Sequence, residues 1–113
     1  MEEDNTAAAM GSGSLEVFAT PAMVALMEQA AAESVNPYLK DEETTVGILM
    51  NVKHLSATAL GGNVKAESVL TQADGRKLCF AVKAYDDAGL IGEGTHERFI
   101  VNSETFMERA VSK

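Results

Sequence analysis

Three polar residues, Thr20, Glu28 and His54, have side chains that could serve as a nucleophile, an acid and a base. Glu28 interrupts the most apolar stretch of the chain, VFATPAMVALMEQAAAES, at residues 17–34. Burial of a polar group without a partner costs about 2–7 kcal/mol, so Glu28 must either meet Lys or Arg or take part in chemistry. His54 has a reference pKa of about 6.5, which suits a general base near neutral pH. A structural hydrogen-bonding role is the alternative for His54.

Thr20 also admits two interpretations, both tied to the start of a helix. Apolar residues recur around Glu28 at helical spacing and predict a helix from Thr20 to about Asn36, where Pro37 disfavours continuation. A Thr followed by Pro is typical of a helix N-cap, with Pro21 at the first helical position. The Thr20 hydroxyl could instead be a nucleophile, if a base such as His54 lies beside it.

The rest of the chain changes to a period of two residues, which is typical of strands. Residues 1–16 form a polar, Gly- and Ser-rich lead-in that we expect to be irregular. The turn signals ADGR and DDAG separate apolar–polar alternation, and a last short helix is expected with Ser103 as its cap. One helix followed by an antiparallel meander predicts an α+β fold in a single domain, residues 1–113. The four predicted strands are residues 45–55, 63–73, 76–86 and 90–101.

The third predicted strand has one apolar face, which the apolar helix is expected to cover. Its apolar side chains alternate with Lys77 and Lys83 on the other face. A core of mainly Ala, Val, Leu and Met is small for this length, which favours a partner subunit. The apolar residues of the strand are Leu78, Phe80, Val82 and Ala84.

Composition narrows the class of protein. The net charge of −8 over 113 residues argues against a nucleic-acid partner, which requires a basic face. No basic leader and no run of about 18 apolar residues is present, so we expect a cytoplasmic protein with no membrane partner. Cys79 is the one cysteine, so no internal disulfide can form. Two His residues and scattered carboxylates at no ligand spacing make a metal site unexpected.

Three segments in order resemble the hotdog-fold thioesterases of the fluoroacetyl-CoA thioesterase type. They are VFATPAMVALMEQAA, TTVGILMNVKHLSATALGG and DGRKLCFAVKAYDDAGLIGEGTHERFIV, and the resemblance runs from about Gly11 to Val101. It implies a long central helix wrapped by an antiparallel sheet, in a homodimer (or a tetramer made of two dimers) with the active site between protomers. It also implies hydrolysis of a small or short-chain acyl-CoA to the free acid and CoA. CoA would then be part of the substrate, with no separate cofactor.

The same resemblance implies roles for individual residues. Thr20, Glu28 and His54 fall on the catalytic positions, while Gly47 and Arg98 fall on positions expected to contact substrate. His96, in THER, is a weaker candidate for a ligand contact. Each has a plainer alternative, because Gly47 could simply relieve crowding between strand and helix. Arg98 could pair with a carboxylate instead of holding a substrate phosphate.

The spacing of Thr20 and Glu28 bears on how such a site would be built. They are eight residues apart, or about 12 Å along a helix, so they cannot both reach one carbonyl from the same helix. We therefore expect Thr20 and Glu28 to meet from opposite protomers. Other functions remain open, namely a non-catalytic acyl-CoA or acyl-carrier binding module, an acyltransferase-like protein acting on acyl thioesters, or a structural dimer. The segment GSGS stands where the fluoroacetyl-specialised relative has bulky aromatics, so the acyl group stays open.

Overall fold

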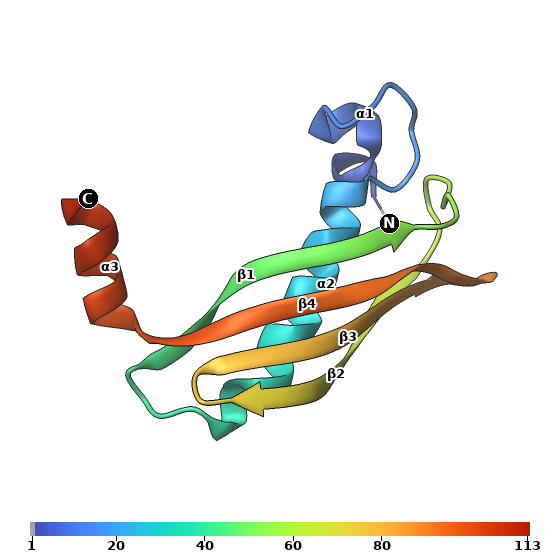
Figure 1. The fold of residues 1–113 in the computed structure, drawn as a ribbon. Helices are drawn as coiled ribbons and strands as arrows, with labels where there is room; N and C mark the ends of the chain where they lie inside the picture. The colour runs from blue at the N-terminus through green and yellow to red at the C-terminus, as the bar shows by residue number, and fades with distance from the viewer. Residues whose placement is uncertain (1) are drawn as a thin grey trace.

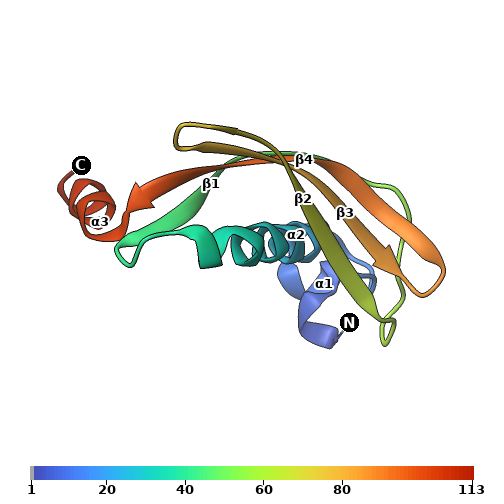
Figure 2. The same cartoon turned by 90° about the horizontal axis from the view of Figure 1, so that it is seen from below.

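A curved antiparallel sheet holds one long helix against its concave face (Figures 1 and 2). The computed structural model describes residues 2–113. The sheet order is β1-β4-β3-β2, so β1 and β2 are the edge strands of this sheet. The strands are β1 (Glu43–His54), β2 (Val64–Asp74), β3 (Lys77–Asp86) and β4 (Gly89–Asn102). The helices are η1 (Glu3–Asn5), α1 (Ala7–Met10), α2 (Thr20–Val35), η2 (Asn36–Tyr38) and α3 (Ser103–Ser112).

The core lies between α2 and the concave face of the sheet. One side of α2 is fully buried at Met23, Met27 and Ala31, which recur at a spacing of four residues. The strand side is the predicted alternation of Leu78, Phe80, Val82 and Ala84, all of them buried. The predicted α+β fold, with a helix covering the apolar face of an antiparallel sheet, is therefore confirmed.

The beginning of the chain is more ordered than the irregular lead-in expected from its composition. It contains η1 and α1, and the fully buried Thr6 accepts a hydrogen bond from the Ala9 N–H at 3.1 Å as the N-cap of α1. Thr6 also forms an isolated bridge with Phe18, which ties this segment to the entrance of α2. A four-residue helix is too short to form alone, so the tertiary contacts account for it.

Both predicted helix caps were wrong by one residue. Ala19 is the N-cap of α2, and Thr20 is its first helical residue, with no side-chain cap hydrogen bond. Asn102, and not Ser103, caps α3 and accepts a hydrogen bond from the Thr105 N–H at 3.0 Å. The error at α2 matters most, because it releases the Thr20 hydroxyl from the capping role.

The two tight hairpins follow from glycines in the left-handed region. Gly75 (φ 62°) closes the β2–β3 turn, and Gly89 (φ 136°) follows the β3–β4 turn, where most residues would be strained. The two hairpins join β2 to β3 and β3 to β4, so strands that follow one another in the sequence also pair in the sheet. In residues 2–113, no helix has the length and apolar character needed to cross a membrane.

Candidate active site

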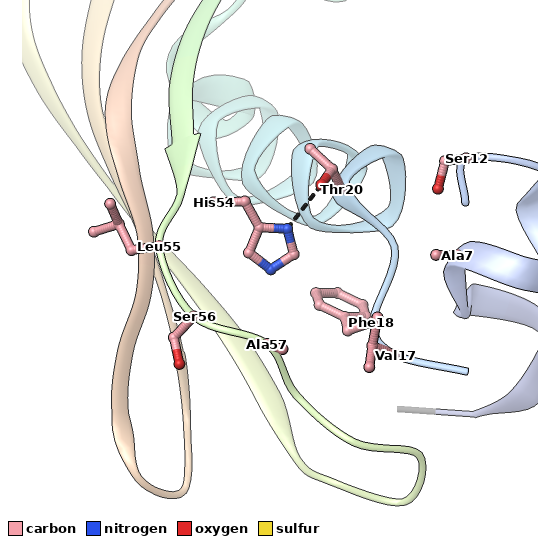
Figure 3. Close-up of a pocket in the computed structure, with 9 residues that line it drawn as sticks. All are labelled: Ala7, Ser12, Val17, Phe18, Thr20, His54, Leu55, Ser56 and Ala57. Atoms are coloured by element: carbon pink, nitrogen blue, oxygen red, sulfur yellow. Dashed lines mark hydrogen bonds between the residues drawn. The ribbon is translucent and has the colours of Figure 1, made fainter. Parts of the chain in front are cut away.

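Thr20 and His54 lie side by side in the fold, joined by a hydrogen bond of 2.8 Å between Oγ1 and Nδ1 (Figure 3). Thr20 comes from the first turn of α2 and is exposed. His54 is the last residue of β1, 34 positions later. Since the hydroxyl caps no helix N–H, its partner is the imidazole, in the arrangement by which a base activates a hydroxyl.

A cavity of about 280 Å³ opens in front of this pair. The Phe18 ring stands edge-on to the His54 ring, with centroids 6.4 Å apart, and forms part of the wall. The remaining lining combines small side chains with a few apolar ones, so the wall presents little bulk (Figure 3). Besides Thr20 and His54, the lining residues are Ala7, Ser12, Val17, Phe18, Leu55, Ser56 and Ala57.

The environment of His54 favours the unprotonated imidazole. Burial lowers the pKa of His54 below its usual 6.5, and the Ser56 backbone offsets part of that shift. Nε2 is buried and has no hydrogen-bond partner within the described residues. An unsatisfied buried donor or acceptor costs about 1–3 kcal/mol, and such a cost in a folded protein requires an explanation. The His54 ring is therefore incompletely satisfied within one chain.

Glu28 lies in a second cluster, where it pairs with Arg98. The Arg98 Nη1 is 3.7 Å from the Glu28 Oε2. The Arg98 side chain is only 9% exposed, whereas 43% of the Glu28 side chain is exposed. Burial lowers the pKa of Arg98, and the charge of Glu28 opposes that shift. This pair answers the question of how a carboxylate is tolerated in an apolar helix: it meets a buried cation on one side and an open surface on the other.

Arg98 is itself fixed by two neighbours on the sheet. Its Nε donates to the Thr45 Oγ1 and its Nη2 to the Thr45 carbonyl, both at 2.8 Å. Its Nη1 lies 3.3 Å from the His96 Nε2, and the His96 Nδ1 lies 2.8 Å from the Leu49 carbonyl. His96 is 1% exposed. The guanidinium therefore has a partner at each of its nitrogens.

Gly47 makes room for the Glu28 carboxylate. A Cβ at Gly47 would lie 2.7 Å from the Glu28 Oε2 and 3.3 Å from a carbon of the His96 ring. The simpler alternative for Gly47, relief of crowding between strand and helix, therefore describes its surroundings. The group that a side chain at position 47 would crowd is the Glu28 carboxylate, so glycine at this position leaves the space that the carboxylate occupies.

The six residues predicted from sequence thus fall into two groups within one chain. Thr20 and His54 meet, and Glu28, Gly47, His96 and Arg98 meet elsewhere on the concave face. The Glu28 carboxylate pairs with Arg98, and it makes no hydrogen bond to His54 in the described chain. Whether a second protomer brings the groups together stays a prediction.

Two neighbours of these residues were missed by sequence reasoning. Thr45 lies two residues before Gly47 on the same strand face, but its partner Arg98 is 53 positions away, and no local pattern indicates that contact. Phe18 lies two residues before the first residue of α2, and its contact with His54 depends on the fold. In residues 2–113, no group of three or more side chains suited to a metal ion lies together.

Comparison with known proteins places the chain in a family. The family model described as fluoroacetyl-CoA-specific thioesterase matches residues 1–104. The fluoroacetyl-CoA thioesterase of Streptantibioticus cattleyicolor is 40% identical over 98 residues, which cover 87% of this chain and 70% of that protein.

Comparison with solved structures agrees with this family assignment. The structure of the fluoroacetyl-CoA thioesterase FlK matches with a TM-score of 0.94 and 34% identity, over 100% of this chain and 88% of that one. A thioesterase superfamily member from Thermus thermophilus matches with a TM-score of 0.89 and 26% identity, over 99% and 85% of the two chains. A hot-dog-like protein from Thermanaerovibrio acidaminovorans, at 23% identity and a TM-score of 0.89, shares the fold over 99% of this chain and 83% of its own. The predicted hotdog fold is confirmed, and the chain belongs to the fluoroacetyl-CoA-specific thioesterase family.

Proposed function

We propose that this protein hydrolyses a small or short-chain acyl-CoA to the free acid and CoA, with Thr20 and His54 at the reaction centre. Membership of a thioesterase family provides the class of reaction, which is thioester hydrolysis. The observation that carries the assignment to these residues is the 2.8 Å contact between the Thr20 hydroxyl and the His54 Nδ1 at the wall of a cavity. A solvent-exposed hydroxyl bonded to an imidazole is what nucleophilic or water-mediated acyl transfer requires.

The chemistry follows from this contact. His54 Nδ1 takes the proton as Thr20 Oγ1, or a water beside it, attacks the thioester carbonyl carbon. The C–S bond then breaks, and the proton passes from His54 to the departing sulfur of CoA. If Thr20 is the nucleophile, a second attack by water releases the acid from its acyl ester. If water attacks directly, the acid is released in one step.

The start of α2 supplies stabilisation for the oxyanion. The first N–H groups of a helix have no partner within it, and the helix dipole adds partial positive charge there. Pro21 has no N–H, so the donors in this first turn are those of Thr20 and Ala22. The N-terminus of α2 is where the positive potential of the helix is greatest. A thioester carbonyl oxygen held there would be stabilised as it gains negative charge in the transition state.

The carboxylate of the site is assigned to the partner's Glu28 in a two-fold dimer. β1 is an edge strand with one neighbour, β4, and its exposed Ile48 and Leu49 suit pairing with a second copy. Two β1 strands related by a two-fold axis run antiparallel, which brings the two protomers' helices alongside each other. The exposed side of Glu28 then faces the reaction centre of the partner. Thr20 of its own protomer is about 12 Å away along the helix, too far to act on the same substrate.

The size of the acyl group is inferred from the cavity and from the relatives. Its volume of about 280 Å³ and its small lining residues Ala7, Ser12 and Ala57 suit a short acyl group and leave space beyond two carbons. Variants of FlK were solved with fluoroacetate and CoA and with acetyl-CoA. The same class of ligand, a CoA thioester of a small acid, is therefore proposed for this protein.

The test is thiol release from a panel of short, branched, aromatic and long acyl-CoAs. Wild type is compared with Glu28→Gln, which keeps the shape and removes the charge. Glu33→Gln is the matched control, because Glu33 is exposed on the same helix. We expect turnover of the short substrates, a loss of about 100-fold or more in Glu28→Gln, and no change in Glu33→Gln. If folded wild type turns over no acyl-CoA of the panel, the proposed hydrolysis is wrong, and protection by CoA in thermal melting then separates an acyl-CoA binding module from a structural dimer.

A further inference from the structure

We infer that Thr45 and His96 are positioning residues, which hold Arg98 so that it fixes the carboxylate of Glu28. This inference rests on the proposed function, in which that carboxylate serves the reaction. The need for such a device comes from the exposure of Glu28. With 43% of its side chain exposed, a glutamate would sample several rotamers unless another group restrained it. Arg98 is the one cation paired with it among residues 2–113.

The restraint depends on how Arg98 is itself held. Thr45 accepts from both Nε and Nη2 at 2.8 Å, through its hydroxyl and its backbone carbonyl. Two bonds from one edge of the planar guanidinium to one residue set the orientation of the plane. The other terminal nitrogen, Nη1, is left pointing toward Glu28 and His96. Thr45 thus determines where the cation presents its remaining donors.

His96 completes the arrangement from the opposite side. The Leu49 carbonyl can only accept a hydrogen bond, so the His96 Nδ1 that lies 2.8 Å from it carries the proton. Nε2 then carries the lone pair and accepts from the Arg98 Nη1 at 3.3 Å. The Phe80 ring packs against the imidazole at a centroid distance of 6.0 Å and limits its rotation. Nε2 therefore holds Arg98 while Nδ1 anchors the ring to β1, so His96 acts on the substrate only through Arg98.

The anchors of this array lie on either side of an irregularity in β1. The pairing of β1 with β4 shifts register between Gly47 and Leu49, which is a β-bulge. The Thr45 carbonyl precedes the bulge, and the Leu49 carbonyl follows it. The hydrogen bonds through Arg98 and His96 therefore span the bulge and keep Gly47 under the Glu28 carboxylate, where a Cβ would not fit. One array thus fixes both the strand geometry and the side chain above it.

A plainer alternative is that Thr45 and His96 only satisfy a buried guanidinium. The two roles differ in what they change. A purely structural role would alter stability and leave the kinetics of the folded enzyme intact. A positioning role would lower kcat with little change in KM, because a misplaced carboxylate fails in the transition state more than in binding.

The decisive comparison is Thr45→Val against Thr45→Ser. Valine has the shape of threonine and lacks the hydroxyl that accepts from the Arg98 Nε, whereas serine keeps it. The backbone carbonyl that accepts from Nη2 is present in both variants. We expect kcat to fall roughly 10-fold or more in Thr45→Val, with KM within about twofold, and to recover in Thr45→Ser. Thr44→Val is the matched control. Thr44 is the adjacent residue and points to the other face of β1, and within residues 2–113 its hydroxyl forms no hydrogen bond. A Thr45→Val enzyme that is folded and has the kcat of wild type would overturn the inference, as would a rise in KM at unchanged kcat.

A second measurement is independent of turnover and of how well Thr45→Val folds. Long-range proton–nitrogen correlation spectra of the imidazoles report which nitrogen carries the proton. We expect the Nδ1–H form for His96 in wild type. In a separate kinetic assay, His96→Gln should lose kcat at constant KM, as Thr45→Val does. An Nε2–H form for His96 would overturn the inference. If wild type turns over no acyl-CoA but His96 is in the Nδ1–H form, the proposed function fails and the array remains.

Discussion

The start of α2 and the middle of the sheet hold their polar residues in opposite ways. Thr20 is exposed and has a single hydrogen bond, to His54, at the wall of an open cavity. Arg98 is 9% exposed and is bonded to Thr45 twice, to His96 and to Glu28. A group that attacks a substrate needs access, whereas a charge that must stay in place needs many partners. The difference indicates that both regions serve the reaction, but that removal of a polar group lowers stability little at the start of α2 and more in the sheet. The following variants test this contrast.

The largest effect is expected from loss of the Thr20 hydroxyl. Thr20→Val should lower kcat/KM by about 10²–10⁴-fold, because it removes the group bonded to His54. The free energy of unfolding should change by less than about 1 kcal/mol, since Ala19 is the N-cap and the hydroxyl satisfies no helix N–H. Thiol release measures the change in kcat/KM, and urea unfolding measures the change in the free energy of unfolding. A variant with full activity, or one that unfolds readily, would erase the contrast between the regions.

Arg98→Met should give the reverse pattern in stability. It leaves the Thr45 carbonyl and hydroxyl without their donor and exposes Glu28 to an apolar neighbour. We expect the free energy of unfolding to fall by about 1–3 kcal/mol, a range kept modest because the Glu28 side chain is 43% exposed. Urea unfolding followed by circular dichroism is the measurement. Lys83→Met, which removes a cation from the outer face, is the control and should change stability by less than about 0.5 kcal/mol.

A smaller effect is expected from Gly47→Ala. The added Cβ would fall 2.7 Å from the Glu28 Oε2, so the carboxylate must move. Because the moving atom is at the end of a flexible side chain, the fold should survive while kcat falls by roughly 10-fold. Steady-state kinetics on the best acyl-CoA of the panel would show this. Unchanged kcat in a folded Gly47→Ala enzyme would mean that the position of the carboxylate is unimportant.

The smallest expected effect is a displacement of the pH profile. Burial lowers the pKa of His54 below 6.5, so the unprotonated base persists to lower pH than an exposed histidine would. The acid limb of kcat/KM should therefore have its midpoint below 6.5. The same shift makes the folded state bind the proton less readily than the unfolded chain, so stability falls as the pH drops below 6.5. A midpoint above 6.5 would indicate that a nearby carboxylate outweighs burial.

The sheet was the most predictable part of the molecule. The alternation of Leu78, Phe80 and Val82 against lysines reports directly on burial, and the Asp74-Gly75 pair marks a hairpin. The short helix α1 was not predictable, because AAAM has no helical length and depends on the contact of Thr6 with Phe18. Local patterns describe what neighbours in the chain can do, and α1 depends on residues distant from it.

The candidate site divides in the same way. A Thr before Pro resembles an N-cap whether or not a histidine lies nearby, so only the fold separates the two roles of Thr20. The pairing of Glu28 with Arg98 joins positions 70 residues apart, and no spacing rule indicates it. The resemblance to a known family supplied these positions where physical reasoning left alternatives open. The two-protomer arrangement of Thr20 and Glu28 remains a prediction.

The helix α3 has a practical consequence for measuring all of this. It extends from the end of β4, away from α1 and the start of α2 (Figure 1), and every one of its residues is exposed. None of its side chains lines the cavity in front of Thr20 and His54. Within one protomer, a fluorescent dye or a surface tether attached at Lys113 would therefore stay clear of Thr20 and His54. Kinetics of labelled protein that match those of the free enzyme would show that the end of α3 also stays clear of the site in the proposed dimer.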